Sequence, residues 1–350
     1  MIAHSKPTIK KEELQAVNKI LKSGQISQGD ITRKFENGFS RYIGMRYGIA
    51  ANSGTAALHL ALLALKIKPK DEIIVPTYVC SAVLNAAGYV NASVKLVDID
   101  PSDFNISIKD LKHKIGPKTK VIIVPHMFGM PADMDRLLSF DIPLIEDCAL
   151  SLGATYKGKK VGSFGLISIF SFYATKLMTT GEGGMILTND NKLANTMRDL
   201  REYDNKDNYL IRYNYKTTDL EAAMGLEQLK KLPSFIKRRQ EISHMYTGGF
   251  SDLQVELPIE KKDRTHIYYR YVIKTKGNIS YYLKRLSQQG IECKRPVYKP
   301  LHRYLKLKDN DFPGATKAYN CVISIPIYPS LENKEVEFII KKIKKVFSNR

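Results

Sequence analysis

The chain has 350 residues, of which 43% are hydrophobic and 26% are charged, and its 55 basic and 35 acidic residues give a net charge of +20. An apolar content of this size excludes a disordered protein, and the length favours one large domain with a smaller one. No apolar run is long enough to cross a bilayer, and the N-terminus lacks the pattern of a secretory signal, so we expect a cytoplasmic protein without a membrane partner.

The elements expected in the first half alternate between short apolar strands and helices, which is typical of an α/β domain with a largely parallel sheet. A helix is expected first, at residues 11–21. Strands are expected at residues 48–51, 72–75, 94–97, 121–124, 144–145, 167–172 and 185–188, with helices at 55–64 and 193–200. Ligands of such sheets bind beyond the carboxyl ends of the strands, so polar residues at those ends are candidates for the functional site.

A second, smaller α+β unit is expected after an amphipathic helix at residues 219–231, which Thr218 or Asp219 would cap. The Leu232-Pro233 pair then marks a change of pattern. We therefore predict a large domain at 1–232 and a small one at 233–350. The small domain would contain a strand at 268–274 and helices at 281–289 and 331–347.

The excess charge does not indicate a nucleic-acid partner. Residues 231–350 contain 25 basic and 11 acidic residues, so 14 of the 20 excess charges lie in the last third. The run KKIKK at 341–345 belongs to an apolar-periodic helix, where it forms a solvated face. The four cysteines are too far apart for a zinc cage or a disulfide framework, and we expect no metal.

Two segments at strand ends suit a phosphorylated, flat ligand. Asn52-Ser53-Gly54-Thr55 leads into a helix, whose N-terminal N–H groups can cradle a phosphate, although an ordinary helix cap explains the same residues. Tyr78 follows the next strand and offers an aromatic face to a ligand, although a core tyrosine is an equal interpretation.

Two further segments carry a carboxylate and an amine. Asp147 ends an apolar strand, where it could pair with a protonated pyridine nitrogen, or serve as a solvated cap. Lys176 follows an aromatic strand and precedes a glycine-rich turn at 181–184. A lysine in such surroundings can form a Schiff base with a carbonyl, although most lysines are simply solvated.

Several motifs occur together in order: IEDCALSLGATYKGKKVGSFG (145–165), FSFYATK (170–176), TTGEGGMILTND (179–190) and NYKTTDLEAAMGLEQL (214–229). They resemble the pyridoxal-phosphate (PLP) dependent nucleotide-sugar aminotransferases of the DegT/DnrJ/StrS group. NSGTAAL (52–58), RPVYKPLH (295–302) and SIPIYP (324–329) extend the resemblance over nearly the whole chain. The resemblance implies PLP as cofactor and the aspartate aminotransferase fold type I, with a mainly parallel mixed sheet between helices.

The resemblance also implies roles for the two charged residues. Lys176 matches the lysine that holds PLP as a Schiff base and moves the proton between substrate and cofactor. Asp147 matches the carboxylate at the pyridine nitrogen, which makes the ring an electron sink. Family members that dehydrate sugars have histidine in place of this lysine, so Lys176 favours transamination.

Further cofactor contacts are implied by the same resemblance. Tyr78 stands where the family places an aromatic ring stacked on the cofactor. Gly54, Thr55 and Ser171 match the phosphate-binding groups, and Asn214 matches an asparagine that reaches the phosphate from the partner subunit. That last match implies a homodimer with a shared active site.

One position departs from the family pattern. Leu150 occupies the place of a Gln or His near the cofactor's 3-hydroxyl, and leucine cannot hydrogen-bond. Candidate substrate residues are His126, Arg295, Tyr298 and His302. A packed histidine at 126 and a solvated basic loop at 295–302 are competing interpretations.

These observations predict an aminotransferase that moves an amino group from an amino acid, with L-glutamate expected, to a keto group on a nucleotide-linked sugar. Two alternatives stay open. A small phosphorylated ketone or a cyclitol could be the acceptor instead, because Leu150 leaves the substrate class unsettled. A non-enzymatic regulator that kept the fold is conceivable from the basic C-terminal third, although it would have no reason to retain both Asp147 and Lys176.

Overall fold

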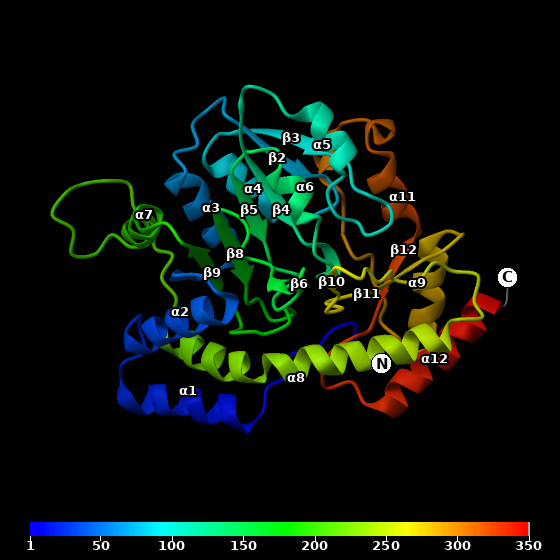
Figure 1. Cartoon of the computed structure of the whole chain (residues 1–350). Coiled ribbons are helices and arrows are strands. Elements are labelled where there is room, and N and C mark those ends of the chain that lie inside the picture. The colour runs from blue at the N-terminus through cyan, green and yellow to red at the C-terminus, as the bar shows by residue number, and fades with distance from the viewer. Residues whose placement is uncertain (349–350) are drawn as a thin grey trace.

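A seven-stranded sheet lies at the centre of the computed structural model, which describes residues 1–348 (Figure 1). In order along the sheet, the strands are β1 (Tyr47–Ala51), β9 (Gly184–Thr188), β8 (Ile167–Ser171), β5 (Leu144–Asp147), β4 (Thr119–Pro125), β2 (Glu72–Pro76) and β3 (Ser93–Val97). Strand β9 is antiparallel to both neighbours, whereas the pairs from β8 to β3 are parallel. All seven strands predicted from the sequence, and the α/β fold class, are confirmed.

The strands are buried on both faces because their side chains alternate between two apolar cores. In β2, Ile73 and Val75 belong to one core and Ile74 to the other. The first core is covered by α3 (Gly54–Ala64), α4 (Ala82–Tyr89) and α7 (Asn191–Arg201). The second is covered by α2 (Asp30–Ile43), α5 (Ile108–Lys114), α6 (Met134–Leu138) and the first part of α8 (Asp219–Gly249). The helices predicted at 55–64 and 193–200 are confirmed.

Helix α8 differs from its predicted extent, because it continues through Pro233 for 31 residues in all. Its start agrees with the prediction, since the Thr218 side chain accepts a hydrogen bond from the Glu221 N–H in a capping box. Proline removes one backbone donor from a helix, but Leu232 and Phe235 on either side of it are buried. Packing therefore outweighs the local cost, and the helix does not end at residue 231. Figure 1 shows α8 running beneath the sheet toward the C-terminal elements.

The C-terminal elements form a third apolar core with the second half of α8. The strand predicted at 268–274 is shorter, at β11 (Tyr271–Lys274), and pairs with β12 (Val322–Ile325). The predicted helices at 281–289 and 331–347 are confirmed as α9 (Ile279–Gln288) and α12 (Asn333–Ser348). The division at residues 232 and 233 stays a prediction, because α8 is continuous there and Val272 and Val322 join the first core.

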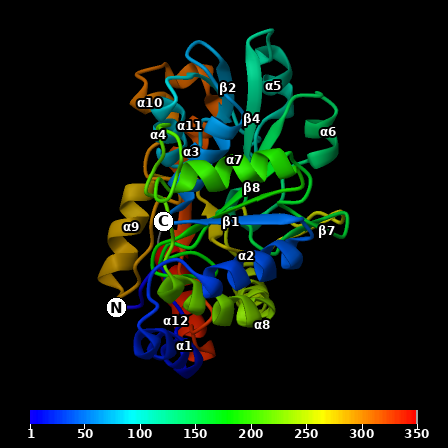
Figure 2. The ribbon, with the colours of Figure 1, turned by 90° about the vertical axis from the view of Figure 1, so that its left-hand side faces the viewer.

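The remaining elements are short, apart from α1. Helix α1 (Lys11–Ser23), predicted at 11–21, lies against α8 (Figure 2). The others are α10 (Leu301–Tyr304), α11 (Pro313–Cys321), the 3-10 turns Met127–Gly129 and Asp309–Asp311, and a small sheet of β10 (Arg264–Thr265), β6 (Thr155–Tyr156) and β7 (Lys159–Lys160). Across residues 1–348, no helix has the length and apolar character needed to cross a membrane.

Candidate active site

A cavity of about 290 Å³ lies where the carboxyl ends of the parallel strands meet the segment 296–304. Asp147 at the end of β5 and Lys176 in the loop after β8 both line it. Parallel strands bring residues that are far apart in sequence to one edge of the sheet, which explains why these two side chains meet. The arrangement places one acid and one amine in a single cavity.

Asp147 is held in place by the start of the turn that follows it. Its Oδ1 accepts a hydrogen bond of 3.0 Å from the Ala149 N–H. Burial raises the pKa of the Asp147 carboxyl, and the Ala149 N–H and the positive charge of Lys176 oppose that rise only in part. A carboxylate that is costly to keep charged is stabilised by any cation placed beside it, such as a protonated ring nitrogen.

Lys176 is oriented by its own loop and by an aromatic ring. Its N–H donates to the Tyr173 carbonyl over 2.8 Å, and its Nζ lies 5.5 Å from the centre of the Tyr269 ring. Burial disfavours the Tyr269 phenolate, but the positive charges of Lys176 and Arg270, together with a hydrogen bond to Thr175 and the charge of Arg239, lower the pKa of Tyr269 overall. An amine over an aromatic face is attracted by the ring quadrupole.

The sequence predictions missed Tyr269 and Arg270, which also line the cavity. The available signal was the polar and aromatic run HIYYR that precedes the apolar strand YVIK. Arg239 on α8 fixes this run, because its buried guanidinium donates to the carbonyls of Tyr268, Tyr269 and Ile327 over 3.0–3.2 Å. A helix far away in sequence therefore sets where the Tyr269 ring lies.

The predicted phosphate-binding residues lie together at the start of α3. The Ser53 side chain accepts from the Ala56 N–H over 3.0 Å, and the N–H groups of Gly54 and Thr55 have no acceptor within the helix. A Cβ on Gly54 would lie 2.9 Å from the Ser171 Cβ, so glycine allows this close approach between helix and strand. These residues are not part of the cavity lining around Asp147 and Lys176.

Asn214 lies in the loop between α7 and α8, beside the turn predicted to bind phosphate. Its side chain is exposed, and its carbonyl accepts from the Asn52 Nδ2 over 3.3 Å. The loop stands out from the rest of the chain (Figure 1).

Tyr78 has the placement of a core tyrosine, which from the sequence was an equal alternative to the stacked ring that the family resemblance implies. The side chain is fully buried, and its ring packs against those of Phe104 and Phe128, with centroid separations of 6.3 and 6.4 Å. Burial raises the pKa of its hydroxyl, which has no hydrogen-bond partner among the described residues. The residues of this segment that line the cavity are instead Val79, Cys80 and Ser81.

His126 is a packed histidine that belongs to a buried hydrogen-bond network. Its Nδ1 accepts from the Ala132 N–H over 3.0 Å, so the neutral ring carries its proton on Nε2, which lies 3.1 Å from Glu146. Glu146 also accepts from the N–H groups of Gly162, Phe164 and Gly165. Burial opposes ionisation, but these donors outweigh it and lower the pKa of Glu146. His126 does not line the cavity.

The three candidate substrate residues of the segment 295–302 separate in the structure. Tyr298 lines the cavity and is 84% exposed. The Arg295 guanidinium donates to the Tyr319 carbonyl and lies over the Tyr319 ring, so it is engaged away from the cavity. His302 is buried between Thr77 and Asp309, at 2.8 and 3.0 Å. Only Tyr298 therefore has the placement expected of a substrate contact.

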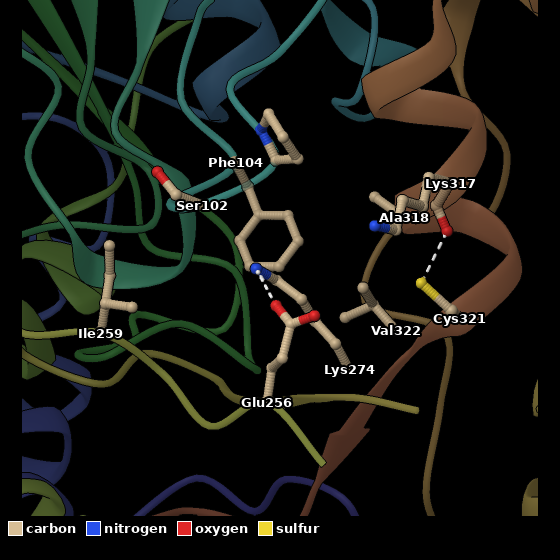
Figure 3. A pocket seen from close by; sticks show the side chains of 10 residues that line it. Ser102, Phe104, Glu256, Ile259, Lys274, Lys317, Ala318, Cys321 and Val322 are labelled. Atoms are coloured by element: carbon tan, nitrogen blue, oxygen red, sulfur yellow. Dashed lines mark hydrogen bonds and ion pairs between the residues drawn. The ribbon is translucent and has the colours of Figure 1, made fainter. Parts of the chain in front are cut away.

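A second cavity, of about 270 Å³, lies between the turn at 101–104 and the C-terminal elements (Figure 3). Lys274 pairs with Glu256 over 3.1 Å on its wall, and the Cys321 thiol donates to the Lys317 carbonyl over 2.9 Å. Neither Asp147 nor Lys176 lines this space. The cavity with the acid and the amine is therefore the candidate active site.

Comparison with known proteins places this site in a family context. The model of the DegT/DnrJ/EryC1/StrS aminotransferase family matches residues 7–344. The chain is 37% identical to GDP-perosamine synthase from Escherichia coli O157:H7, over 98% of each protein. It is 36% identical to the uncharacterized protein MJ1066 of Methanocaldococcus jannaschii, over 98% of this chain and 97% of that protein. Spr1654 from Streptococcus pneumoniae, solved in its PLP form, has a TM-score of 0.93 at 29% identity and 99% coverage of both chains.

Proposed function

The chain belongs to the DegT/DnrJ/EryC1/StrS aminotransferase family, and from this we propose that it moves an amino group from an amino acid, with L-glutamate expected, to a keto group on a nucleotide-linked sugar. It is a PLP-dependent aminotransferase. The observation that carries the proposal is the meeting of Lys176 and Asp147 in one cavity. The similarity to a GDP-perosamine synthase supports the class of acceptor.

The residues present fit this cofactor. Asp147 has the raised pKa of a buried carboxyl that lacks a full cationic partner, which a protonated pyridine nitrogen would supply. Gly54 and Thr55 offer helix N-terminal N–H groups to a phosphate, with Ser171 beside them. When bound, PLP supplies an aldehyde and an electron-accepting ring. Lys176 would bond to the aldehyde and hold or move the proton at its Nζ.

The charge around the cavity favours anionic ligands. Its lining includes Lys176, Arg270 and Lys299 but only one carboxylate, Asp147. Phosphorylated molecules are attracted by such an excess of positive charge. A nucleotide-linked sugar carries a diphosphate, so both it and the cofactor are suited to this lining.

The acceptor class can be tested with protein loaded with pyridoxamine phosphate. We expect ketosugar nucleotides to be aminated, which converts the cofactor to PLP and restores its visible absorbance. A panel of small phosphorylated ketones and cyclitol ketones is the comparison. Leu150 lines the cavity with a side chain that cannot hydrogen-bond, and for that reason these compounds are the second candidate class. Turnover of the small ketones alone would refute the nucleotide-sugar acceptor.

We also propose a homodimer in which Asn214 reaches the partner's phosphate site. The projecting loop carries large apolar side chains in solvent: Tyr209 is 92% exposed and Ile211 is 70% exposed. Apolar side chains gathered on a projecting segment favour a protein interface. A cytoplasmic location stays a prediction of the sequence.

Substitution of both loop residues tests the dimer. Tyr209→Asp with Ile211→Asp should shift the protein to a monomer in sedimentation velocity and weaken PLP binding by about tenfold, because one group of the phosphate site would be missing. Leu138→Asp, at a 43% exposed position on α6, is the matched control and should leave both properties unchanged. A stable monomer that binds PLP as tightly as the native protein would contradict the shared site.

A further inference from the structure

We propose that Cys80 contacts the bound cofactor, and that cofactor binding therefore shields its thiol from chemical modification. The inference rests on the proposed function of the cavity. It assigns the cofactor-facing position of the β2–α4 connection to a small thiol, where the family resemblance implied the aromatic ring of Tyr78.

The backbone after β2 determines which side chain faces the cavity. Thr77 is fixed on two sides, because its N–H donates to the Val97 carbonyl over 2.8 Å and its carbonyl accepts from the Leu301 N–H over 2.7 Å. The next side chain, Tyr78, enters the core, and Cys80 is turned into the cavity before α4 begins at Ala82. The Tyr78 ring cannot reach a ligand there without leaving its contacts with Phe104 and Phe128.

Cys80 lines the same cavity as the two charged residues of the site, Asp147 and Lys176. Burial raises the pKa of its thiol, the negative charge of Asp147 adds to the rise, and the positive charge of Lys176 opposes it. The thiol therefore shares its cavity with both groups that would hold the cofactor and responds to the charge of each. A protonated thiol behaves as a small, polarizable apolar group, which suits contact with an uncharged part of a ligand.

The other cysteines differ from Cys80 in exposure and location. Cys80 is accessible to solvent through the open cavity, although the protein around it desolvates its thiol. Cys148 is buried, and Cys293 and Cys321 are intermediate. Cys321 lines the second cavity (Figure 3), whose lining includes neither Asp147 nor Lys176. It is therefore an internal control whose reactivity a ligand at Lys176 should not change.

Alkylation with N-ethylmaleimide provides the test. The thiol adds across the maleimide double bond, so that a sulfur–carbon bond forms, the thiol proton ends on the neighbouring carbon, and no group leaves. Peptide mass spectrometry would follow Cys80 and Cys321 in cofactor-free protein, with and without saturating PLP. We expect PLP to slow labelling of Cys80 at least about tenfold, as mass action predicts for an occupied site, and to leave Cys321 within about twofold. Equal labelling of Cys80 in both samples would overturn the proposal.

Two variants identify the thiol that is responsible. Maleimide treatment should abolish PLP binding by native protein and by Cys321→Ser in equilibrium dialysis, whereas Cys80→Ser should bind PLP after treatment as tightly as the same variant does before it. Loss of binding in treated Cys80→Ser that binds PLP before treatment would refute the role of Cys80. If untreated native protein bound no PLP, both this inference and the proposed function would fail. If PLP bound without protecting Cys80 from labelling, the contact with Cys80 would be refuted and the proposed function would stand.

Discussion

Replacement of Lys176 by alanine is expected to abolish transamination and the visible absorbance band of the lysine-bound cofactor. The variant loses both the nucleophile and the group that moves the proton, so the rate should fall on the order of 10⁴-fold or more. The free energy of unfolding should change by less than about 1 kcal/mol, because Lys176 Nζ makes no hydrogen bond or ion pair to other residues within 1–348 and lies 5.5 Å from the centre of the Tyr269 ring. Stopped-flow absorbance and a urea titration would measure these effects.

Lys299→Ala is the matched control for this change. Lys299 lines the same cavity, but its Nζ lies over the Tyr304 ring, 4.6 Å from the ring centre. Its loss removes one positive charge without removing the reactive amine, so the absorbance band should persist while the KM for a phosphorylated acceptor rises. If Lys176→Ala retained the band and Lys299→Ala lost it, the assignment of the reactive lysine would be incorrect.

The sequence was sufficient for the central sheet because each strand is a short apolar run that is buried on both faces. Such runs are defined by their composition, and Ile73 to Val75 is an example. Helix α2 was missed, although its apolar residues at 31, 35, 39 and 43 have helical spacing. Its start depends on Asp219, which accepts hydrogen bonds from the N–H groups of Gly29 and Thr32 across 187 to 190 positions of sequence. Because the capping side chain comes from so far along the chain, the residues around position 29 carry no capping signal that would mark the start of the helix.

The position of a site residue could be predicted from the sequence where the residue ends a strand. It could not be predicted where the residue lies in a loop, because the loop's distant contacts decide the direction of its side chain. Asp147 ends β5, so its place at the sheet edge follows from the strand itself. The segment after β2 has no such regularity, and whether Tyr78 or Cys80 enters the cavity depends on the contacts of Thr77 with Val97 and Leu301. Arg295 illustrates the same dependence, because Tyr319, which comes 24 residues later, holds its guanidinium.

Asp147→Asn is expected to retain the fold and some cofactor but to lose most of the rate. An asparagine oxygen can still accept from the Ala149 N–H, so the local turn should survive. The negative charge that would hold the ring nitrogen protonated is lost, and breaking such a buried charge pair costs about 3–5 kcal/mol, which corresponds to roughly 150- to 5,000-fold in rate. Glu146→Gln is the comparison, because the Glu146 carboxylate contacts His126 and three backbone N–H donors. This substitution should lower the unfolding temperature rather than the rate of transamination.

The pH dependence of cofactor binding gives a separate test of Asp147. Burial raises the pKa of this carboxyl, so it loses its charge as the pH falls through a value above the ordinary range for aspartate. The affinity of the native protein for PLP should therefore be full above that pKa and decline below it, whereas Asp147→Asn should lack this acidic decline. Fluorescence or dialysis titrations between about pH 4 and 8 would cover the range in which a raised carboxyl titrates. An identical decline in the variant would assign the pH dependence to another group and remove Asp147 from the ring nitrogen.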